Sequence, residues 1–353
     1  MREMQHRIRR AHVCALAHVL AIVGATLLAW PQPGSRAHRA AGADTGLERA
    51  AACFVNVFMV SMCGNSPLAW LVAGVFMAIG DARFASLERA VFARFGHAYD
   101  GHGGYVLALL TFACFCVPYV VHGVALLPLE LHAASARAAR AYKLQPTQAV
   151  TARTAVRTGC TAVLLLFGVG LPYVLLFGVA SVVTRGRVGV RLAGDPPAYT
   201  ECAWMLVFNL LVLEVLFYYI HRALHWPPLY RRVHKMHHEH TAPFALAAVY
   251  AHPAEVLFGN LVPFSAGLWL TRPHIVFVYM WIVGACLGTQ THHSGFRFPW
   301  VACADEQPDF HDFHHERFVG CYGTTGLLDA LHGTSAAFYE DRAARARARE
   351  KQS

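Results

Sequence analysis

Residues 201–225 read ECAWMLVFNLLVLEVLFYYIHRALH. From Ala203 to Ile220 the only charged residue is Glu214. A hydrocarbon core about 30 Å thick needs about 20 apolar residues in a helix, so we expect a membrane span here. His221 and His225 follow at once, and residues four apart share one face of a helix. The stretch therefore predicts a membrane-spanning helix that ends in a pair of potential metal ligands.

Four further apolar runs follow the same logic. The runs 105–127 and 160–183 contain no Asp, Glu, Lys or Arg over 23 and 24 residues, so each is long enough to span a membrane. The run 244–270 is a further candidate, and a short joint containing Pro273 separates it from the run 275–290. A proline in so short a joint favours a tight helical hairpin.

The first 100 residues contain two more apolar segments. Residues 12–30 follow a basic run and are typical of a signal anchor or a signal peptide. Residues 50–80 are broken by Cys-Gly-Asn-Ser-Pro at 63–67, so they could form one kinked span or a re-entrant pair. We expect an N-terminal membrane or anchor region of unknown role.

The composition supports a membrane protein. Only 14% of the 353 residues are charged and 56% are hydrophobic, whereas an ordinary globular domain has about 25% charged residues. This balance excludes a disordered chain and argues against a cytosolic enzyme. The net charge of +9 comes partly from the basic ends, Met1–Arg10 and Arg342–Lys351, which suit a membrane surface with anionic lipid. We find no nucleic-acid-binding motif, and the ten cysteines form no CxxC pair that would indicate a disulfide or zinc framework.

Histidine is the residue that indicates function. Eleven of the 22 histidines lie in the windows 221–240 and 292–315. The pattern His-x-x-His-His occurs twice, and its three rings fall on one face of a helix, which is an effective way to bind a transition metal. We call the pair His221–His225 and the two His-x-x-His-His motifs histidine boxes, and each of the three borders an apolar run. The eight box histidines are His221, His225, His234, His237, His238, His311, His314 and His315.

The order of the segments brings the two windows together. Between them lie only the runs 244–270 and 275–290, so two crossings, or two re-entrant halves, return the chain to the side that it left. His252 lies about two turns into the first run, a depth at which ionisable groups are usually functional, and Glu255 is its expected partner. We therefore predict one site on one membrane face.

Eight to ten neutral imidazoles exceed what one ion can use, so a dinuclear centre is predicted. Imidazole suits iron, zinc, copper and nickel. Asp309, Asp312 and Glu239 lie beside the boxes and are expected to accept hydrogen bonds from the free ring N–H groups. A metal centre where apolar helices leave the bilayer suggests a lipid substrate.

These motifs resemble the fatty acid hydroxylase superfamily. The resemblance covers roughly residues 140–340 and rests on the histidine boxes together with Tyr-Ala-His-Pro-x-Glu at 250–255 and His-Ser-Gly-Phe at 293–296. The last two motifs look most like the C4-methyl sterol oxidase branch, and the ending 321–334 fits the same branch. Thr289 and Phe217 stand where many relatives carry histidine, so the number of ligands is left open.

The resemblance implies a multi-pass endoplasmic reticulum enzyme with a cytosol-facing non-haem di-iron centre. It implies that O2 and electrons from NAD(P)H, delivered by a separate cytochrome b5 or reductase, are used to oxidise a sterol C4-methyl group. The eight box histidines would be the catalytic metal ligands, with His293 and His252 as further candidates.

Other functions are compatible with the same residues. A sterol C5-desaturase or a fatty-acyl or alkyl-lipid hydroxylase would use the same histidines. A metal transporter would place its ligands near the bilayer midplane, within broken helices. We predict an all-α membrane bundle with a histidine-rich di-metal cap, divided into an anchor region (1–100), membrane helices with an amphipathic connector (101–200), a catalytic domain (201–340) and a basic tail (341–353).

Overall fold

The structure is a computed structural model. It describes residues 46–62, 86, 89–96, 102–132, 140–185, 187–192, 197–297 and 306–352. These residues form helices and no strand, as the all-α prediction requires. The apolar segment predicted at 12–30 and the break predicted at 63–67 lie outside the described residues.

Among the described residues, four helical segments are long and apolar enough to cross a membrane, and they confirm four of the predicted spans. They are α5 (Gly103–His132), the continuous segment α7–η1–α8 (Ala152–Val183), α9 (Tyr199–Leu224) and α12 (Ile275–His292). Within the second segment, α7 covers Ala152–Leu165, the π-helix η1 covers Leu166–Gly170 and α8 covers Leu171–Val183. Large apolar side chains such as Leu164 and Leu176 are exposed on its outer face, as expected for contact with lipid tails.

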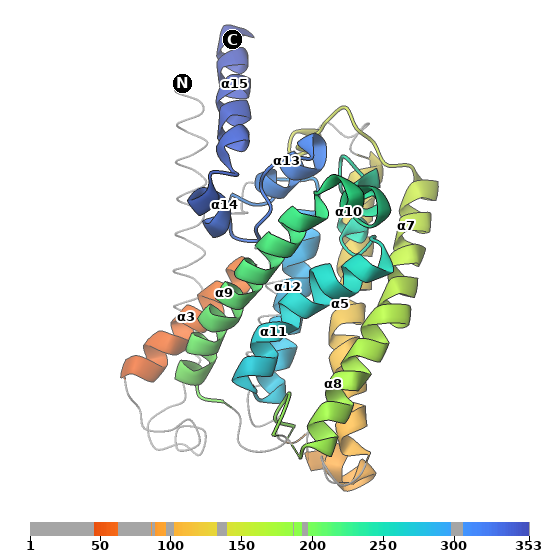
Figure 1. Ribbon diagram of the computed structural model, residues 1–353, viewed down its shortest axis with the longest axis vertical. Coiled ribbons are helices and arrows are strands. Elements are labelled where there is room, and N and C mark those ends of the chain that lie inside the picture. Colours follow the sequence, from red (N-terminus) through yellow and green to blue (C-terminus); the bar gives the residue numbers. More distant parts are fainter. Residues whose placement is uncertain are drawn as a thin grey trace.

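Helix α12 is the centre of the bundle (Figure 1). It is apolar on all sides and most of its residues are buried, including Trp281, which is completely enclosed. Helix α5 packs against both α12 and α8, and α9 packs against α3 (Gly46–Met62) and α11 (Val262–Thr271). A helix without a polar face must be covered all round, which explains the central position of α12.

The run 244–270 is not the continuous span that its composition suggests. It begins with a 3₁₀ turn, η3 (Ala245–Ala247), continues through an irregular stretch, and then forms the π-helix η4 (Glu255–Leu261) and α11. The first part is buried inside the protein, where the Tyr119 hydroxyl donates to the Leu246 carbonyl at 2.7 Å. The α11–α12 hairpin is confirmed, with Arg272 in the left-handed conformation just before Pro273.

Short helices close one end of the bundle (Figure 1). They are α10 (Pro227–Arg232), η2 (His234–Glu239), α13 (Asp309–Arg317) and α14 (Leu327–His332), and the basic tail forms helix α15 (Ala336–Gln352). Phe338 at the start of α15 packs against Phe310 and Phe313 of α13. Both histidine windows lie at this end of the bundle, as predicted.

Candidate metal centre

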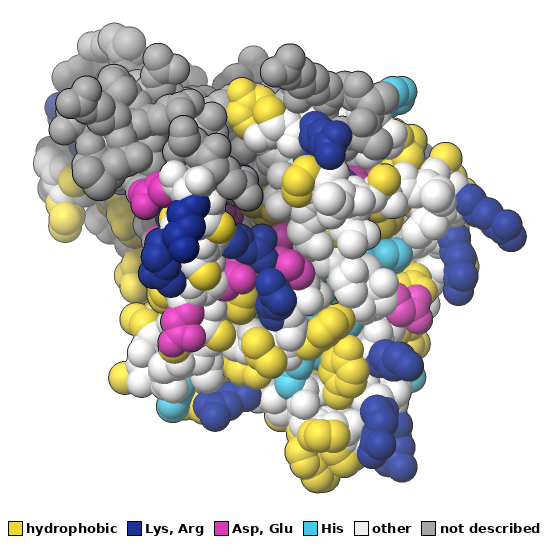
Figure 2. All heavy atoms as spheres, turned by 90° about the horizontal axis from the view of Figure 1, so that it is seen from above, with side chains coloured by type: hydrophobic (Ala, Val, Ile, Leu, Met, Phe, Trp, Pro, Cys, Tyr) yellow, Lys and Arg dark blue, Asp and Glu magenta, His cyan; other side chains and the backbone are white. Residues whose placement is uncertain are grey.

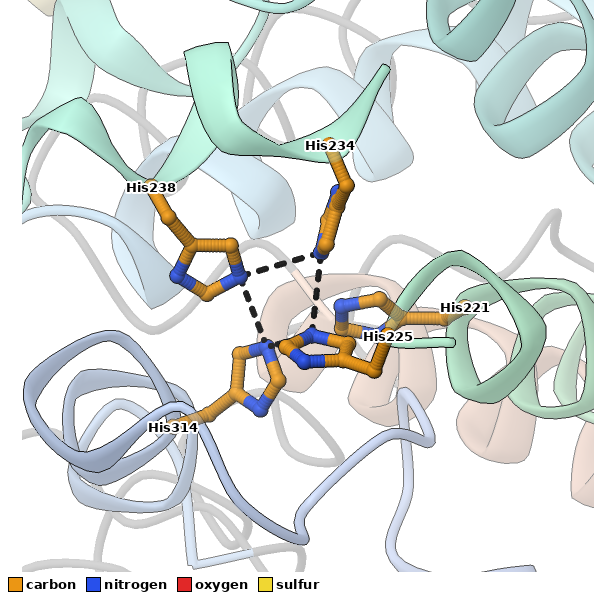
Figure 3. A group of neighbouring side chains, drawn as sticks. All are labelled: His221, His225, His234, His238 and His314. Atoms are coloured by element: carbon orange, nitrogen blue, oxygen red, sulfur yellow. Dashed lines mark hydrogen bonds between the residues drawn. The ribbon is translucent and has the colours of Figure 1, made fainter. Parts of the chain in front are cut away.

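Within the ranges that the structure describes, nine histidines converge at this end of the bundle in two groups. Within each group, the nitrogen atoms that could bind a metal all lie within 4.8 Å of one another. Group 1, shown in Figure 3, is His221, His225, His234, His238 and His314. Group 2 is His237, His293, His311 and His315. Eight of the nine are buried, and only His225 is partly exposed.

Each His-x-x-His-His box contributes to both groups. The box on η2 gives His234 and His238 to group 1 and His237 to group 2, and the box on α13 gives His314 to group 1 and its other two histidines to group 2. The two groups adjoin, because the rings of His238 and His315 lie 4.7 Å apart. The three rings of a box therefore serve two groups rather than one. In addition, η2 is a tight 3₁₀ helix and not the expected α-helix.

Hydrogen bonds determine which nitrogen of these rings carries the proton. In five of the nine rings, Nδ1 lies 2.7 to 3.2 Å from a backbone carbonyl oxygen. A carbonyl only accepts, so each of these Nδ1 atoms donates and each Nε2 is left with its lone pair. These rings are His221, His237, His293, His314 and His315, whose acceptors are the carbonyls of Tyr322, Tyr250, Thr289, Gly320 and His240.

The Nε2 atoms point at one another. Neighbouring Nε2 atoms lie 3.0 to 3.2 Å apart in group 1 and 2.9 to 3.4 Å apart in group 2. His237 and His293 both hold their proton on Nδ1, so their Nε2 lone pairs face each other and repel unless a cation lies between them. Two imidazole nitrogens bound at about 2.1 Å and about 90° apart on one ion would lie ~3.0 Å from each other. The donor set therefore fits one transition-metal ion in each group.

Burial keeps these rings neutral, as metal ligands must be. It lowers the pKa of His225 and of His237 to about 4. Burial likewise lowers the pKa of five further rings, and neighbouring imidazoles lower it more because two adjacent cations would repel. These five are His234, His238, His311, His314 and His315.

One predicted ligand is not brought to either group. His252 belongs to neither, and its Nδ1 accepts a hydrogen bond from the backbone N–H of Ala254 at 3.2 Å. Its expected partner Glu255 instead accepts from Nδ1 of His234 at 2.9 Å. The structure therefore replaces the predicted His252–Glu255 pair by a His234–Glu255 pair.

The three carboxylates that were expected to accept from the ring N–H groups have other partners. Glu239 accepts from the Tyr250 hydroxyl at 2.8 Å, Asp309 pairs with Arg297, and Asp312 accepts from a glutamine amide at 3.2 Å. Asp312 directly follows a metal-facing histidine, so its side chain lies about 100° further round the helix. Burial raises the pKa of Asp312 to about 7.

The loop 320–326, which leads into α14, contacts group 1 and was not among the predicted features of the site. Its carbonyl at Gly320 accepts from Nδ1 of His314 at 2.7 Å, and its carbonyl at Tyr322 accepts from Nδ1 of His221 at 2.8 Å. The loop therefore orients two of the five rings of this group.

Two buried carboxylates hold this loop in place. Glu214 in α9 accepts from the backbone N–H groups of residues 324, 325 and 328, and Asp329 accepts from those of residues 322 and 323. Gly323 passes between them, and a Cβ there would lie 2.5 Å from Glu214 Oε1 and 2.9 Å from Asp329 Oδ2, so no larger residue fits without a shift. Glu214 could have been found from the sequence, since it is the one charge in an apolar run and such residues are functional by default.

A cavity with about 400 Å³ of space between atoms, part of it open to the surface, lies beside both groups. Histidines of both groups form part of its wall. Phe217 and Leu224 of α9, and Gly259 and Asn260 of η4, form another part. Helices with π-type hydrogen bonding occur frequently at functional sites, and η4 supplies both this wall and the Glu255 carboxylate. The site can therefore present a metal centre to a partly apolar molecule.

We expect the Glu255→Gln variant to bind metal 10- to 100-fold more weakly, roughly the usual cost of losing the group that orients a ligand imidazole. The carboxylate accepts the Nδ1 proton of His234, whereas an amide can present its N–H there instead. Metal titration of the chelator-treated protein measures the effect. Glu239→Gln is the control, because that carboxylate accepts from the Tyr250 hydroxyl. Equal affinity of the two variants would contradict the role of Glu255.

The metal-free protein should lose stability as the pH falls. An unfolded histidine has a pKa of about 6.5, whereas the pKa of buried His237 is lowered to about 4. Between these values the unfolded chain binds protons that the folded chain does not, so stability falls with falling pH by up to about 1.4 kcal/mol per unit from this residue alone. Thermal melting in detergent should show a lower midpoint at about pH 5.5 than at about pH 7.5. An unchanged or higher midpoint at the lower pH would count against buried neutral rings.

Comparison with known proteins places these features in a family. The sequence profile of the fatty acid hydroxylase family matches residues 206–334, a range that contains every histidine of the two groups. Fatty acid hydroxylase domain-containing protein 2 of Macaca fascicularis is 39% identical over 42% of this chain and 45% of its own length. The chain thus spans less than half of that relative.

For two other relatives, the match to this chain covers more than two thirds of their own length. Methylsterol monooxygenase 2-2 of Arabidopsis thaliana is 35% identical over 51% of this chain and 69% of its own length. Very-long-chain aldehyde decarbonylase GL1-8 of Oryza sativa subsp. indica is 35% identical over 54% of this chain and 74% of its own length. No solved structure matches the chain. With its apolar helical bundle, its paired imidazole groups and these relatives, the chain belongs to the fatty acid hydroxylase family.

Proposed function

We propose that this chain is a non-haem di-iron monooxygenase that oxidises the C4-methyl group of a sterol. The observation that carries the proposal is the pair of adjoining imidazole groups at the end of an apolar helical bundle. Structural zinc sites favour cysteine, and no cysteine of the described part of the chain belongs to either group, so imidazole-bound iron with a redox role is the better fit. Residues 201–340 would be the catalytic domain.

The side chains of the two groups would hold and orient the metal centre. Histidines of group 1 and group 2 would each bind one iron ion through Nε2, while the backbone carbonyls and Glu255 hold the Nδ1 protons in place. The two irons, when bound, would supply the O2-dependent oxidation of an unactivated C–H bond that side chains cannot perform. Burial of the rings keeps bulk water from the metal-facing nitrogens.

The positions of two sequence motifs in the site favour a sterol as the substrate. Tyr-Ala-His-Pro-x-Glu at 250–255 supplies the Tyr250 carbonyl to His237 and the Glu255 carboxylate to His234. His-Ser-Gly-Phe at 293–296 supplies His293 to group 2. These motifs look most like the C4-methyl sterol oxidase branch, and Glu255 and His293 both line the cavity. A methylsterol monooxygenase is among the relatives.

Electrons would come from NAD(P)H through a separate cytochrome b5 or reductase. Lysine and arginine side chains lie around the end of the molecule at which the histidines gather (Figure 2). The side chains of Arg222, Arg231, Arg232 and Lys235 are exposed next to the histidine boxes, so this end would attract an acidic donor protein. We further propose that the chain lies in the endoplasmic reticulum membrane with this end towards the cytosol.

Deleting the gene from its host and analysing the lipids tests the substrate. We expect 4-methyl or 4,4-dimethyl sterols to accumulate and to disappear when the gene is restored. Unchanged sterols with a loss of 2-hydroxy lipids would overturn the sterol proposal in favour of a fatty-acyl hydroxylase. A metal transporter is disfavoured, because most of the nine histidines lie beyond the ends of the candidate spanning helices and not within them.

A further inference from the structure

A second cavity lies inside the bundle, away from the histidine groups. It contains about 560 Å³ of space between atoms, part of it open to the surface, and is lined chiefly by residues of α5, α8, α11 and α12. Most of its wall residues are buried, among them Ala108, Gly178, Leu268, Val278 and Ile282. Wall atoms that face empty space lose van der Waals contacts, so an apolar hollow in a helical bundle favours an occupant.

The hydroxyl groups of the wall are already bonded within the protein. Thr111 donates to a carbonyl one turn earlier in α5 at 2.8 Å. Ser181 accepts from the Val190 backbone N–H at 3.0 Å. Ser265 donates to a carbonyl of its own helical segment at 2.7 Å and also hydrogen-bonds the Tyr173 hydroxyl. The wall therefore favours a hydrocarbon occupant over a polar one.

The seam between α8 and α11 offers a way in from the bilayer. Helix α8 packs mainly on α5, and α11 packs mainly on α9. Two side-chain pairs bridge α8 and α11, namely the Tyr173–Ser265 hydrogen bond and the Phe177–Trp269 contact, whose ring centroids lie 3.9 Å apart. Tyr173, Phe177 and Ser265 also line the cavity. Side chains can change rotamer without any helix unfolding, so this seam can open to lipid.

Two helical segments, η4 and α12, line both the apolar cavity and the cavity at the histidines. In η4, Asn260 lines the cavity at the histidines and the next residue, Leu261, lines the apolar cavity. In α12, Thr289 borders the first cavity, whereas Ile282 and Ile275 border the second. At about 1.5 Å per residue, the length of α12 from Ile275 to Thr289 is ~21 Å. A molecule that occupies both cavities would therefore be elongated and about that long.

We propose that the apolar cavity binds the hydrocarbon end of the lipid whose other end reaches the histidine groups, and that this lipid enters between α8 and α11. The inference rests on the proposed function for the identity of the reactive end. The binding chemistry itself requires only a long apolar chain, which a sterol side chain and a long acyl chain both provide.

Photolabelling of the full-length protein in phosphatidylcholine nanodiscs tests the proposal. One arm uses a diazirine sterol and the other a diazirine fatty acid, and the labelled residues are mapped by mass spectrometry. We expect one of the probes to label Val278, Ile282 or Leu268, and unlabelled competitor to remove this label. Labelling by the sterol alone would identify a sterol site, and labelling by the fatty acid alone an acyl-chain site. Labels confined to outward-facing residues such as Leu164 and Leu176 would overturn the proposal.

The His314→Ala variant separates this inference from the proposed function. Cavity labelling should persist in this variant, because His314 does not line the apolar cavity. If the cavity is labelled but deletion of the gene leaves the host sterols unchanged, the proposed binding site is supported and only the proposal of a sterol substrate is rejected. If neither probe labels the cavity, the proposed binding site is rejected, and this result does not depend on which reaction the protein catalyses.

Filling the cavity provides a kinetic test. Ala108→Leu adds bulk to the wall, and we expect the KM for the long substrate to rise about tenfold with kcat within about twofold, as for a pocket that has become one or two carbons too small. Leu176→Trp is the matched control, because Leu176 is 63% exposed on the outer face of α8. If the Ala108→Leu variant does not fold, the labelled residues of the unaltered protein decide whether the cavity binds the lipid. Identical KM values for the folded filling variant and the control would contradict the proposal.

Discussion

His314→Ala is expected to abolish oxidation while the protein still inserts into the membrane. The ring is completely buried, and its Nε2 lies 3.1 Å from that of His225 and 3.2 Å from that of His238. The substitution removes one donor from group 1 and leaves the Gly320 carbonyl without its Nδ1 partner. Activity should fall by more than about 100-fold, since even the loss of groups that orient the ligands costs roughly 10- to 100-fold. A reconstituted turnover assay measures the loss.

Neighbouring histidines supply the comparisons for this experiment. His315→Ala should be equally inactive, because His315 is the next residue of α13 but belongs to group 2. His237→Ala should behave in the same way, because it also belongs to group 2. His332→Ala should retain activity, because this ring stacks on Tyr218 and belongs to neither group. Full turnover by the His314, His315 or His237 variant would refute the ligand assignment.

Glu214→Gln is expected to destabilise the protein and to weaken metal binding from a position outside both groups. The carboxylate is 1% exposed, and it accepts from three backbone N–H groups and the Thr324 hydroxyl at distances of 2.7 to 3.2 Å. An amide of the same shape turns an N–H group towards one of those donors, and a buried donor that loses its acceptor costs about 1–3 kcal/mol. The loop that Glu214 holds includes Tyr322, whose carbonyl accepts from His221.

The metal affinity of this variant should fall about 10-fold or more, because the His221 ring loses its support. Glu201→Gln is the control on the same helix. Its partner is Arg191, and both side chains of that pair are about one-third exposed, so the change should cost no more than about 1 kcal/mol. Metal titration and thermal melting of the two variants measure the difference. A Glu214→Gln protein with the stability and metal affinity of the control would show that the loop does not depend on this carboxylate.

Local patterns were sufficient to predict the framework of this protein. The uncharged runs at 105–127 and 160–183 become membrane-length helices, because a long apolar run has no other way to satisfy its backbone in lipid. The histidine boxes were visible from their spacing alone. The predicted return of the chain through the α11–α12 hairpin brought both boxes to one end of the bundle.

The division of the histidines into two groups could not be predicted in this way. It depends on how η2 and α13 face each other, which is a tertiary contact with no period in the sequence. The Nδ1 acceptors were missed for a related reason. Most are backbone carbonyls, such as those of Tyr250 and Tyr322, and a carbonyl leaves no trace in the residue type. The run 244–270 was predicted as one membrane span, because hydrophobicity alone does not distinguish a lipid-facing helix from a segment buried in protein.

The metal content of the purified full-length protein tests the central claim most directly. Elemental analysis of the unaltered chain, expressed with iron available and purified without chelator, should find two iron ions per chain. The same analysis of a double variant, His314→Ala with His315→Ala, should find a clear loss of iron. An unaltered chain that is folded and carries no bound metal, or one whose iron content does not change when these two rings are removed, would contradict the account.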